Sequence, residues 1–225
     1  FCMYFLHACT MTSIHLGKLA SELILWSSNL AGLFDVHSEY STGSSIMPQK
    51  RNPDSLELIR SKANIIRSKS QEFSNIISNL PLTYFKDFQE DKKIIFDCFD
   101  ELSICLNVMS DVIKKSHFNK KIGVELCETN FATATDLADY LVIEKNIPFR
   151  KSYKTIAEIV QFALNNKMKL SELSLKEFQK FEKSIDSNIY QYIDVKKSLA
   201  RKKTNMSTNP KEVSKKIRKF QKFLK

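Results

Sequence analysis

The sequence predicts an all-α protein, in which a bundle of long helices is followed by a small helical domain. Among its 225 residues there are only 4 glycines and 5 prolines, too few for the many turns of a sheet protein. Long stretches also repeat apolar residues at the three- and four-residue spacing of an amphipathic helix. These stretches become shorter after residue 120, so we expect a bundle domain at 1–120 and a helical domain at 121–225.

The first two long helices are separated by a connection and an irregular loop. The first helix is expected at 1–28, where apolar residues follow one helical face. The second is expected to begin after Asn52, which would cap it, with Pro53 at the first helical position. Pro81 is expected to end it near residue 80, because proline does not continue a helix.

The third long helix is expected from Asp87 to about Lys115, after a short polar link. Three long helices with short connections describe an up-and-down bundle. The inner faces are predicted from apolar residues at helical spacing: Leu56, Ile59, Ala63, Ile66, Phe73 and Ile77 in the second helix, and Ile95, Phe99, Leu102, Leu106, Met109 and Ile113 in the third.

The second domain is expected to contain shorter helices, because its apolar periodicity is interrupted more often. The helices are predicted at about 133–146, 152–166, 174–181 and 210–225, and loops are predicted at 146–148 and 195–210.

Residues 41–54 lie between helical stretches but are not expected to be helical, because a glycine and two prolines interrupt the hydrogen-bond ladder. The stretch combines small hydroxyls, backbone amides without helical partners, and the adjacent cations Lys50 and Arg51. Such groups suit a site that binds an anion and places an oxygen against it. Composition alone favours an ordinary connecting loop between two helices.

The net charge of +10 is concentrated in the second half of the chain. Residues 1–100 hold 10 basic and 11 acidic side chains, whereas residues 101–225 hold 25 and 14. A basic half can indicate nucleic-acid binding. Here, however, 29 of the 35 cations are lysines scattered along helical patterns. A solvated lysine-rich surface is favoured, and no nucleic-acid partner is expected.

The cysteines and histidines give no metal-binding pattern. Five cysteines without a CxxC pair favour free thiols in a reducing compartment, which predicts a cytoplasmic protein. Four histidines form neither HxH nor HExxH, so we expect no metal site and no cofactor.

The chain opens on an apolar run with no initiator methionine and no charge before Lys18. A signal peptide needs a basic start, and polar residues interrupt this run, so neither a signal nor a membrane span is expected. The run fits a core helix entered midway, which indicates a piece of a longer protein.

The stretch Gly43-Ser44-Ser45-Ile46-Met47-Pro48-Gln49-Lys50-Arg51-Asn52-Pro53 resembles the signature of the fumarase/aspartase superfamily. Members of that superfamily are homotetrameric helical lyases that release fumarate. The stretches 54–60, 83–92, 135–141 and 147–150 are similar to argininosuccinate lyases in particular. The resemblance covers the whole chain but only the C-terminal half of that family's length, and it assigns 1–120 to the end of the central bundle.

This resemblance implies a lyase that splits argininosuccinate into arginine and fumarate, without a cofactor. By resemblance, Ser44 is the catalytic base and Lys50 is the cation that faces the developing negative charge. Asn52 matches a substrate-contacting position, and Glu57 matches an acid that holds Lys50 or a catalytic histidine in place. Without the family, Glu57 would fit a surface acid equally well.

Three further positions match residues that bind the carboxylates and the amino-acid end of the substrate: Tyr84, Gln89 and Lys92. Gln89 and Lys92 are three residues apart and therefore share one helix face. Their alternative interpretation is a solvated first turn, since acidic residues surround them.

The chain also departs from the family. The family's general-acid histidine lies upstream of the signature, and neither His7, His15 nor His37 matches its motif. Smaller departures are Phe85, where the family has Asn, and Tyr153, where it has His. Met206 and Ser207 stand in place of two glycines, which removes easy access to positive φ.

Two other functions remain open. Another fumarate-releasing lyase of the superfamily would share the loop, although residues 54–60 and 84–92 argue against it. A non-catalytic helical protein that keeps the fold would tolerate the absence of the N-terminal half, although the retained Ser44 and Lys50 speak against decay.

Overall fold

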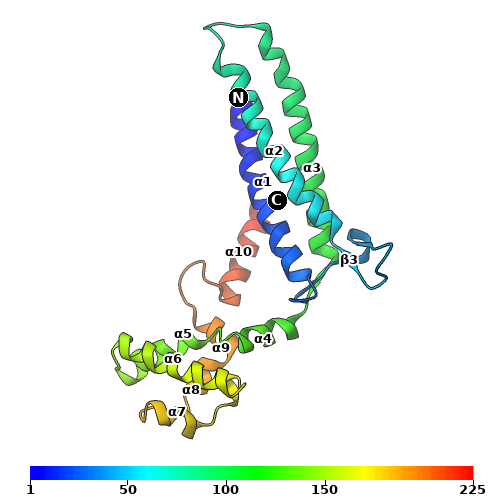
Figure 1. The fold of residues 1–225 in the computed structure, drawn as a ribbon. Coiled ribbons are helices and arrows are strands. Elements are labelled where there is room, and N and C mark those ends of the chain that lie inside the picture. The colour runs from blue at the N-terminus through cyan, green and yellow to red at the C-terminus, as the bar shows by residue number, and fades with distance from the viewer. Residues whose placement is uncertain (225) are drawn as a thin grey trace. The chain divides into compact units, whose positions relative to one another are not determined.

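The computed structural model describes residues 1–224 (Figure 1). Within these residues the regular secondary structure is helical apart from four two-residue strands, which confirms the predicted all-α class. It divides into two compact units, of which the first is Phe1–Lys120 and the second is the rest of the described chain. We refer to them as unit 1 and unit 2. No helix in residues 1–224 is both long and apolar enough to cross a membrane.

Unit 1 consists of three long helices that run side by side: α1 (Cys2–Ser27), α2 (Asp54–Ser78) and α3 (Asp91–Lys115) (Figure 1). Helices α1 and α2 approach closely at Gly17, where an added Cβ would lie 3.2 Å from the Cβ of Ala63. The core between the helices is apolar and includes Leu6, Leu23, Leu56, Ile66, Cys98 and Val112. Burial of this face, rather than helix propensity, stabilises the bundle.

The predicted inner face of α2 is confirmed, whereas that of α3 is only half right. In α2, the predicted residues from Leu56 to Phe73 are buried, and Ile77 packs partly against the core. In α3, the predicted Met109 is buried and the predicted Ile95 and Leu102 pack partly against the core, but the other buried residues, Ile94, Cys98, Cys105 and Val112, were not predicted.

The α3 error has a physical cause, because this helix is apolar on two sides. Phe99 is 56% exposed, Leu106 is 44% exposed and Ile113 is 43% exposed, although all three were predicted to be buried. Each follows a buried residue by one position, and successive residues of an α-helix lie about 100° apart. The prediction combined apolar residues from the buried side and from the exposed side of α3, so the predicted face lay between these two sides.

Three helix boundaries in unit 1 also differ from the prediction. Asn52 does not cap α2; it lies in a strand, and Pro53 stands at the N-cap position. Helix α2 ends at Ser78, since the residue before Pro81 is disfavoured in helical geometry. A 3₁₀ turn, η2 (Lys86–Glu90), precedes α3, so the third helix begins four residues later than expected.

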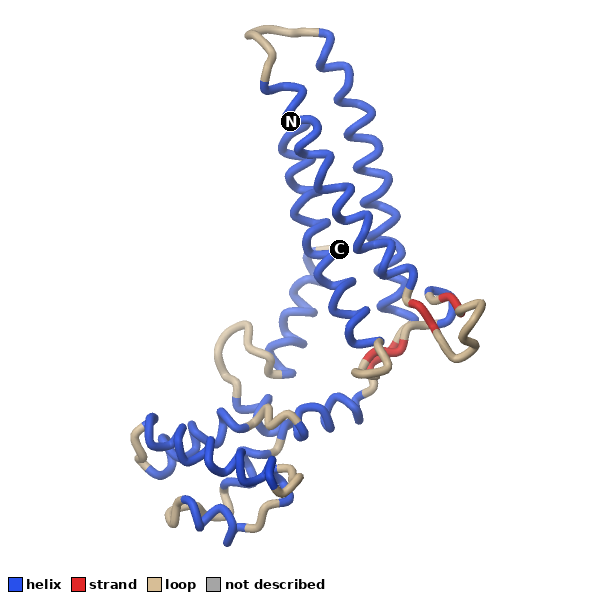
Figure 2. Tube along the Cα trace, in the orientation of Figure 1, coloured by secondary structure: helices blue, strands red, loops and turns tan. Residues whose placement is uncertain are grey.

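Two short antiparallel ladders organise the connections of unit 1 (Figure 2). Strand β1 (Phe34–Asp35) pairs with β4 (His117–Phe118), which ties the chain after α1 to the end of α3. The rings of Phe34 and Phe118 lie 4.8 Å apart, and Trp26 contacts Phe118 edge-on at 5.9 Å. Strand β2 (Thr42–Gly43) pairs with β3 (Arg51–Asn52), a hairpin the sequence did not predict.

Unit 2 is built from shorter helices: α4 (Lys120–Thr129), α5 (Ala134–Lys145), α6 (Phe149–Asn165), α7 (Leu175–Phe181), α8 (Ile189–Ile193), α9 (Val195–Arg201) and α10 (Pro210–Phe223), with the 3₁₀ turn η3 (Leu170–Glu172). Helices α4, α8 and α9 were not predicted, and α9 occupies part of the expected 195–210 loop. Its start is fixed by the Asp194 carboxylate, which accepts the Lys197 amide at 2.8 Å. Helix α8 has only five residues, which are too few to show a period. Helix α9 is as long as α7, which was predicted, so length alone does not account for the missed α9.

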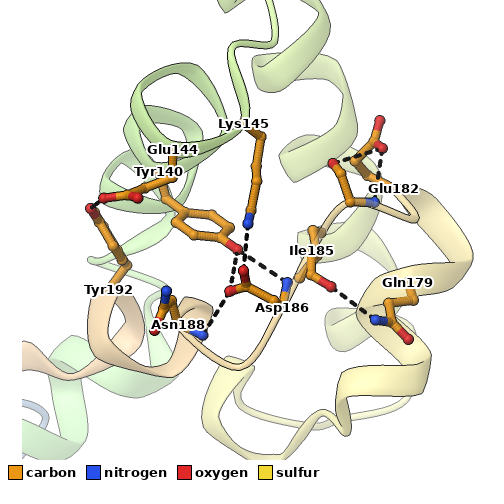
Figure 3. A network of polar contacts seen from close by, with 10 residues as sticks. Tyr140, Glu144, Lys145, Gln179, Glu182, Ile185, Asp186, Asn188 and Tyr192 are labelled. Carbon is orange, nitrogen blue, oxygen red and sulfur yellow. Dashed lines mark hydrogen bonds and ion pairs between the residues drawn. The ribbon is translucent and has the colours of Figure 1, made fainter.

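A polar network closes the core of unit 2 around Tyr140 (Figure 3). The Tyr140 hydroxyl donates to Asp186 Oδ1 at 3.0 Å and accepts the Asp186 amide at 3.1 Å. Lys145 Nζ lies 2.5 Å from Asp186 Oδ2, and the Asn188 amide donates to Oδ1. The network therefore joins α5 to the segment that precedes α8.

This network makes the stability of unit 2 pH-dependent. The hydrogen bond from Lys145 is the main reason that the pKa of Asp186 lies below its ordinary value. A depressed carboxyl pKa stabilises the fold above the unfolded value of 3.8, and this stabilisation is lost as pH falls through the folded pKa below it. We expect Asp186→Asn to flatten the acid side of the stability profile.

The measurement is denaturant unfolding between about pH 5 and pH 2, followed by tyrosine circular dichroism, while fluorescence of the single Trp26 follows unit 1. Asp139→Asn on the exposed side of α5 is the matched control. An unchanged acid profile in Asp186→Asn would remove Asp186 as the cause.

Candidate active site

The signature loop is the segment 44–50, which closes the β2–β3 hairpin of unit 1. Thr42 pairs with Asn52 and Gly43 with Arg51, so the loop leaves and re-enters the ladder at adjacent points. The two strands that carry the loop are also fastened to α2, because the Thr42 hydroxyl donates to the carboxylate of Asp54 in the first turn of that helix. The hairpin therefore fixes both ends of an otherwise exposed loop.

Ser44 lies at the start of this loop with its hydroxyl oxygen turned toward the loop's own backbone. Its Oγ accepts the amide of Ile46 at 3.2 Å and that of Met47 at 3.1 Å. Two amide dipoles aimed at one oxygen favour negative charge on that oxygen. The structure thus gives Ser44 the donors that a serine base requires.

Lys50 and Arg51 lie at the other end of the loop, where the Lys50 amide closes a turn on the Met47 carbonyl at 3.0 Å. Both cations line a hollow of about 540 Å³ that also includes Ser41 and Asp35. The Lys50 side chain is exposed, and Asn52 is half-buried beside it in β3. The hollow presents two cations and one carboxylate, which suits an anionic ligand.

Glu57 lies at the surface in the first turn of α2. Its amide bonds to the Pro53 carbonyl at 3.1 Å. None of the ion pairs found within residues 1–224 joins its carboxylate to Lys50. This chain therefore places Glu57 near the loop but does not make the contact expected of it.

The second group of predicted residues gathers at the α2–α3 connection. The Gln89 side-chain amide donates to the Tyr84 hydroxyl, and the Tyr84 ring stacks on Phe88 with centroids 6.0 Å apart. Lys92 Nζ lies 2.9 Å from Asp91 Oδ1, and this contact is the main cause of the raised pKa of Lys92. Tyr84, Gln89 and Lys92 thus lie together, as a binding cluster requires.

The two groups of predicted site residues lie at opposite ends of α2 (Figure 1). With 25 residues at 1.5 Å per residue, α2 spans about 37 Å. One copy of the chain therefore does not bring the signature loop to Tyr84. A site that used both groups would need them from different copies.

Sequence reasoning overlooked Asp91, whose side chain is only 18% exposed and contacts Lys92. It was grouped with its acidic neighbours as a solvated surface. The signal available was its adjacency to Lys92, but adjacent helical residues do not face each other in general. Within residues 1–224, no cluster of three or more acidic, histidine or cysteine side chains could hold a metal ion.

Solved structures of lyases share this fold. The chain resembles an EDDS lyase variant with bound fumarate with a TM-score of 0.87 at 22% identity, over 97% of this chain and 45% of that one. It resembles the class II fumarase of Schistosoma mansoni with a TM-score of 0.72 at 18% identity, over 90% and 40%. The chain therefore has the helical fold of these lyases.

Sequence comparisons identify the family of lyases to which the chain is similar in sequence. The model of the family described as Lyase matches residues 1–68, and that described as Argininosuccinate lyase C-terminal matches residues 131–200. The argininosuccinate lyase of Pelagibacter ubique is 38% identical over 99% of this chain, and that of Nitratiruptor is 39% identical over 94%. This chain belongs to the argininosuccinate lyase family.

The chain spans about half the length of the curated relatives that it matches. It covers 48% of the Pelagibacter ubique enzyme and 46% of the Nitratiruptor enzyme.

Proposed function

We propose that the protein containing this chain is an argininosuccinate lyase, a carbon–nitrogen lyase that splits argininosuccinate into arginine and fumarate in arginine biosynthesis. The observation that carries the proposal is Ser44, whose Oγ accepts two backbone amides within the family's signature loop. Serine hydroxyls also accept nearby amides in ordinary turns, so the catalytic interpretation rests on this arrangement together with the match of the surrounding residues to the signature. The β-elimination, in contrast, needs a strong base at this position.

In the proposed reaction, Ser44 removes a proton from the carbon beside a substrate carboxylate. The electrons pass into that carboxylate, which becomes an aci-carboxylate with additional negative charge. Lys50 and the half-buried Asn52 face this charge, and preorganised donors of this kind stabilise it most when water is excluded. Release of the guanidino nitrogen then completes the elimination, with its proton supplied by a general acid from outside this chain.

Glu57 is proposed to hold a partner that another segment supplies. Its carboxylate is exposed in the first turn of α2 and therefore free to accept a hydrogen bond there. The partner would be either Lys50, after the loop moves, or a catalytic histidine.

Tyr84, Gln89 and Lys92 are proposed to bind the carboxylates and the amino-acid end of argininosuccinate. The cluster offers a phenol, an amide and an ammonium within one short segment. Hydroxyl, amide and ammonium groups are the donors that carboxylates accept most readily.

A homotetramer is proposed as the active assembly. The separation of the two groups by α2 requires more than one copy, and α3 carries a surface suited to another helix. On its exposed side, residues recur at alternating spacings of three and four, as in a coiled-coil seam. We call this the α3 seam: Phe96, Phe99, Ser103, Leu106, Ser110 and Ile113.

The resemblance to the family also suggests which part of the complete enzyme each unit corresponds to. Unit 1 is proposed to be the end of the central bundle, and unit 2 the C-terminal helical domain. We infer a cytoplasmic location, supported by the five free thiols of the described chain. The lysine-rich surface is proposed to be solvated rather than a nucleic-acid site.

The test is release of fumarate from argininosuccinate, followed by ultraviolet absorbance. The chain is assayed alone and mixed with the protein encoded immediately upstream. Activity in the mixture supports the proposal, and substrates of fumarase, aspartase and adenylosuccinate lyase in parallel reveal its specificity. A folded oligomer that is silent with every substrate in both preparations would favour a non-catalytic helical protein.

A further inference from the structure

The carboxylate of Asp91 lies at the centre of a cluster that the proposed reaction does not yet use. Its Oδ1 accepts the Lys92 ammonium at 2.9 Å, and its Oδ2 accepts the thiol of Cys2 at 3.8 Å. Cys2 belongs to the first turn of α1, whereas Asp91 and Lys92 open α3. Two helices therefore converge on this one carboxylate.

The side chains in this cluster differ in how much of their surface is exposed to solvent. The Asp91 side chain is 18% exposed and Cys2 is 8% exposed, whereas the Lys92 side chain is 59% exposed. A lysine at such a surface loses considerable rotamer freedom when it is held in one orientation. The buried carboxylate is the group that limits this freedom.

Asp91 also faces the proposed binding cluster. It lines a hollow of about 530 Å³ together with Cys2, Thr83 and Tyr84. The Lys92 ammonium interacts electrostatically with Tyr84 as well as with Asp91. Thr83 adopts φ of 93°, which is unfavourable for a β-branched residue, so the segment before Tyr84 is itself constrained.

We propose that Asp91 is a positioning residue, which holds the Lys92 ammonium beside Tyr84 and Gln89 and is itself held by the Cys2 thiol. The proposal rests on the binding role given to Lys92 above. In this arrangement α1 acts on the binding cluster through the hydrogen bond from Cys2 to Asp91. A purely structural Asp91 would only favour the start of α3 through the helix dipole.

The first test follows the ammonium of Lys92 directly by NMR in the full chain, without any substrate. The pKa of Lys92 lies above its ordinary value chiefly because of Asp91, so Asp91→Asn is expected to lower it. Cys2→Ala is expected to give a smaller decrease, because the carboxylate then loses one of its two tethers. Asp111→Asn, which removes the exposed partner of Lys114 in the same helix, is the control and should leave Lys92 unchanged.

The second test is kinetic and uses the preparation that releases fumarate. Asp91→Asn is expected to raise KM for argininosuccinate roughly fivefold with kcat within twofold, because uniform binding is weakened rather than the chemical step. Asp91→Glu is expected to restore part of the loss. Equal falls in kcat and in thermal stability, with no change in KM, would overturn the positioning role.

The two tests separate the failure of this inference from failure of the proposed function. If the wild-type preparation releases no fumarate, the proposed function fails, and the NMR measurement still decides whether Asp91 holds Lys92. If fumarate is released but Lys92 titrates identically in Asp91→Asn, the inference fails alone.

Discussion

Ser44→Ala is expected to reduce fumarate release by roughly 10³-fold or more, at the upper part of the range for losing an acid–base group. The substitution removes the oxygen that accepts the Ile46 and Met47 amides, so the loop keeps its donors but loses the base. Helicity and assembly should be unchanged, because this oxygen lies outside the core.

The matched control for this prediction is Ser68→Ala. Ser68 is also a serine of unit 1, but its hydroxyl only bonds back to the Ile65 carbonyl within α2. It should retain turnover within about twofold, since surface substitutions away from special features change little. Turnover in Ser44→Ala equal to that of this control would exclude Ser44 as the base.

Leu106→Glu is expected to break the assembly into smaller species and to abolish activity with it. Leu106 occupies the middle of the α3 seam and is 44% exposed in the isolated chain. Burying the remaining 44% of this leucine contributes less than half of the about 1.5–3 kcal/mol that complete burial gives, and a carboxylate buried in its place adds a further penalty. Activity falls because the signature loop and Tyr84 then no longer meet.

The measurement is mass by analytical ultracentrifugation, with circular dichroism as a check of the fold. Asn107→Glu, one residue further along and exposed outside the α3 seam, is the control and should assemble normally. If Leu106→Glu and Asn107→Glu gave the same mass as the unsubstituted protein, the α3 seam would not be an interface.

Much of the fold could be predicted because a long helix shows a regular spacing of apolar residues along the sequence. The buried face of α2 was readable since most of its large apolar residues lie on one side, although Leu58 and Ile65 are exposed. That of α3 was only partly readable, because spacing alone does not decide which of its two apolar sides packs against α1 and α2. Helix α8 was missed for a different reason, as its five residues are too few to display a period.

The candidate site was predictable to a similar degree. The motif pointed to Ser44 and Lys50, but the two amides on the Ser44 oxygen are a property of how the loop folds. The role of Asp91 was hidden because its second tether, Cys2, lies 89 positions away in the chain. Spacing along a helix is encoded locally, whereas a contact between helices depends on their packing.

Helix α2 also limits how the length of this protein can change during evolution. It is a rod of 25 residues with one group of site residues at each end. One inserted residue would turn one end relative to the other by about 100° and shift it by about 1.5 Å. Seven inserted residues would nearly restore the orientation but separate the ends by a further 10 Å or so. Substitutions on the surface of the middle of this rod, away from Glu57 and from its two ends, are therefore expected to be tolerated better than insertions or deletions within it.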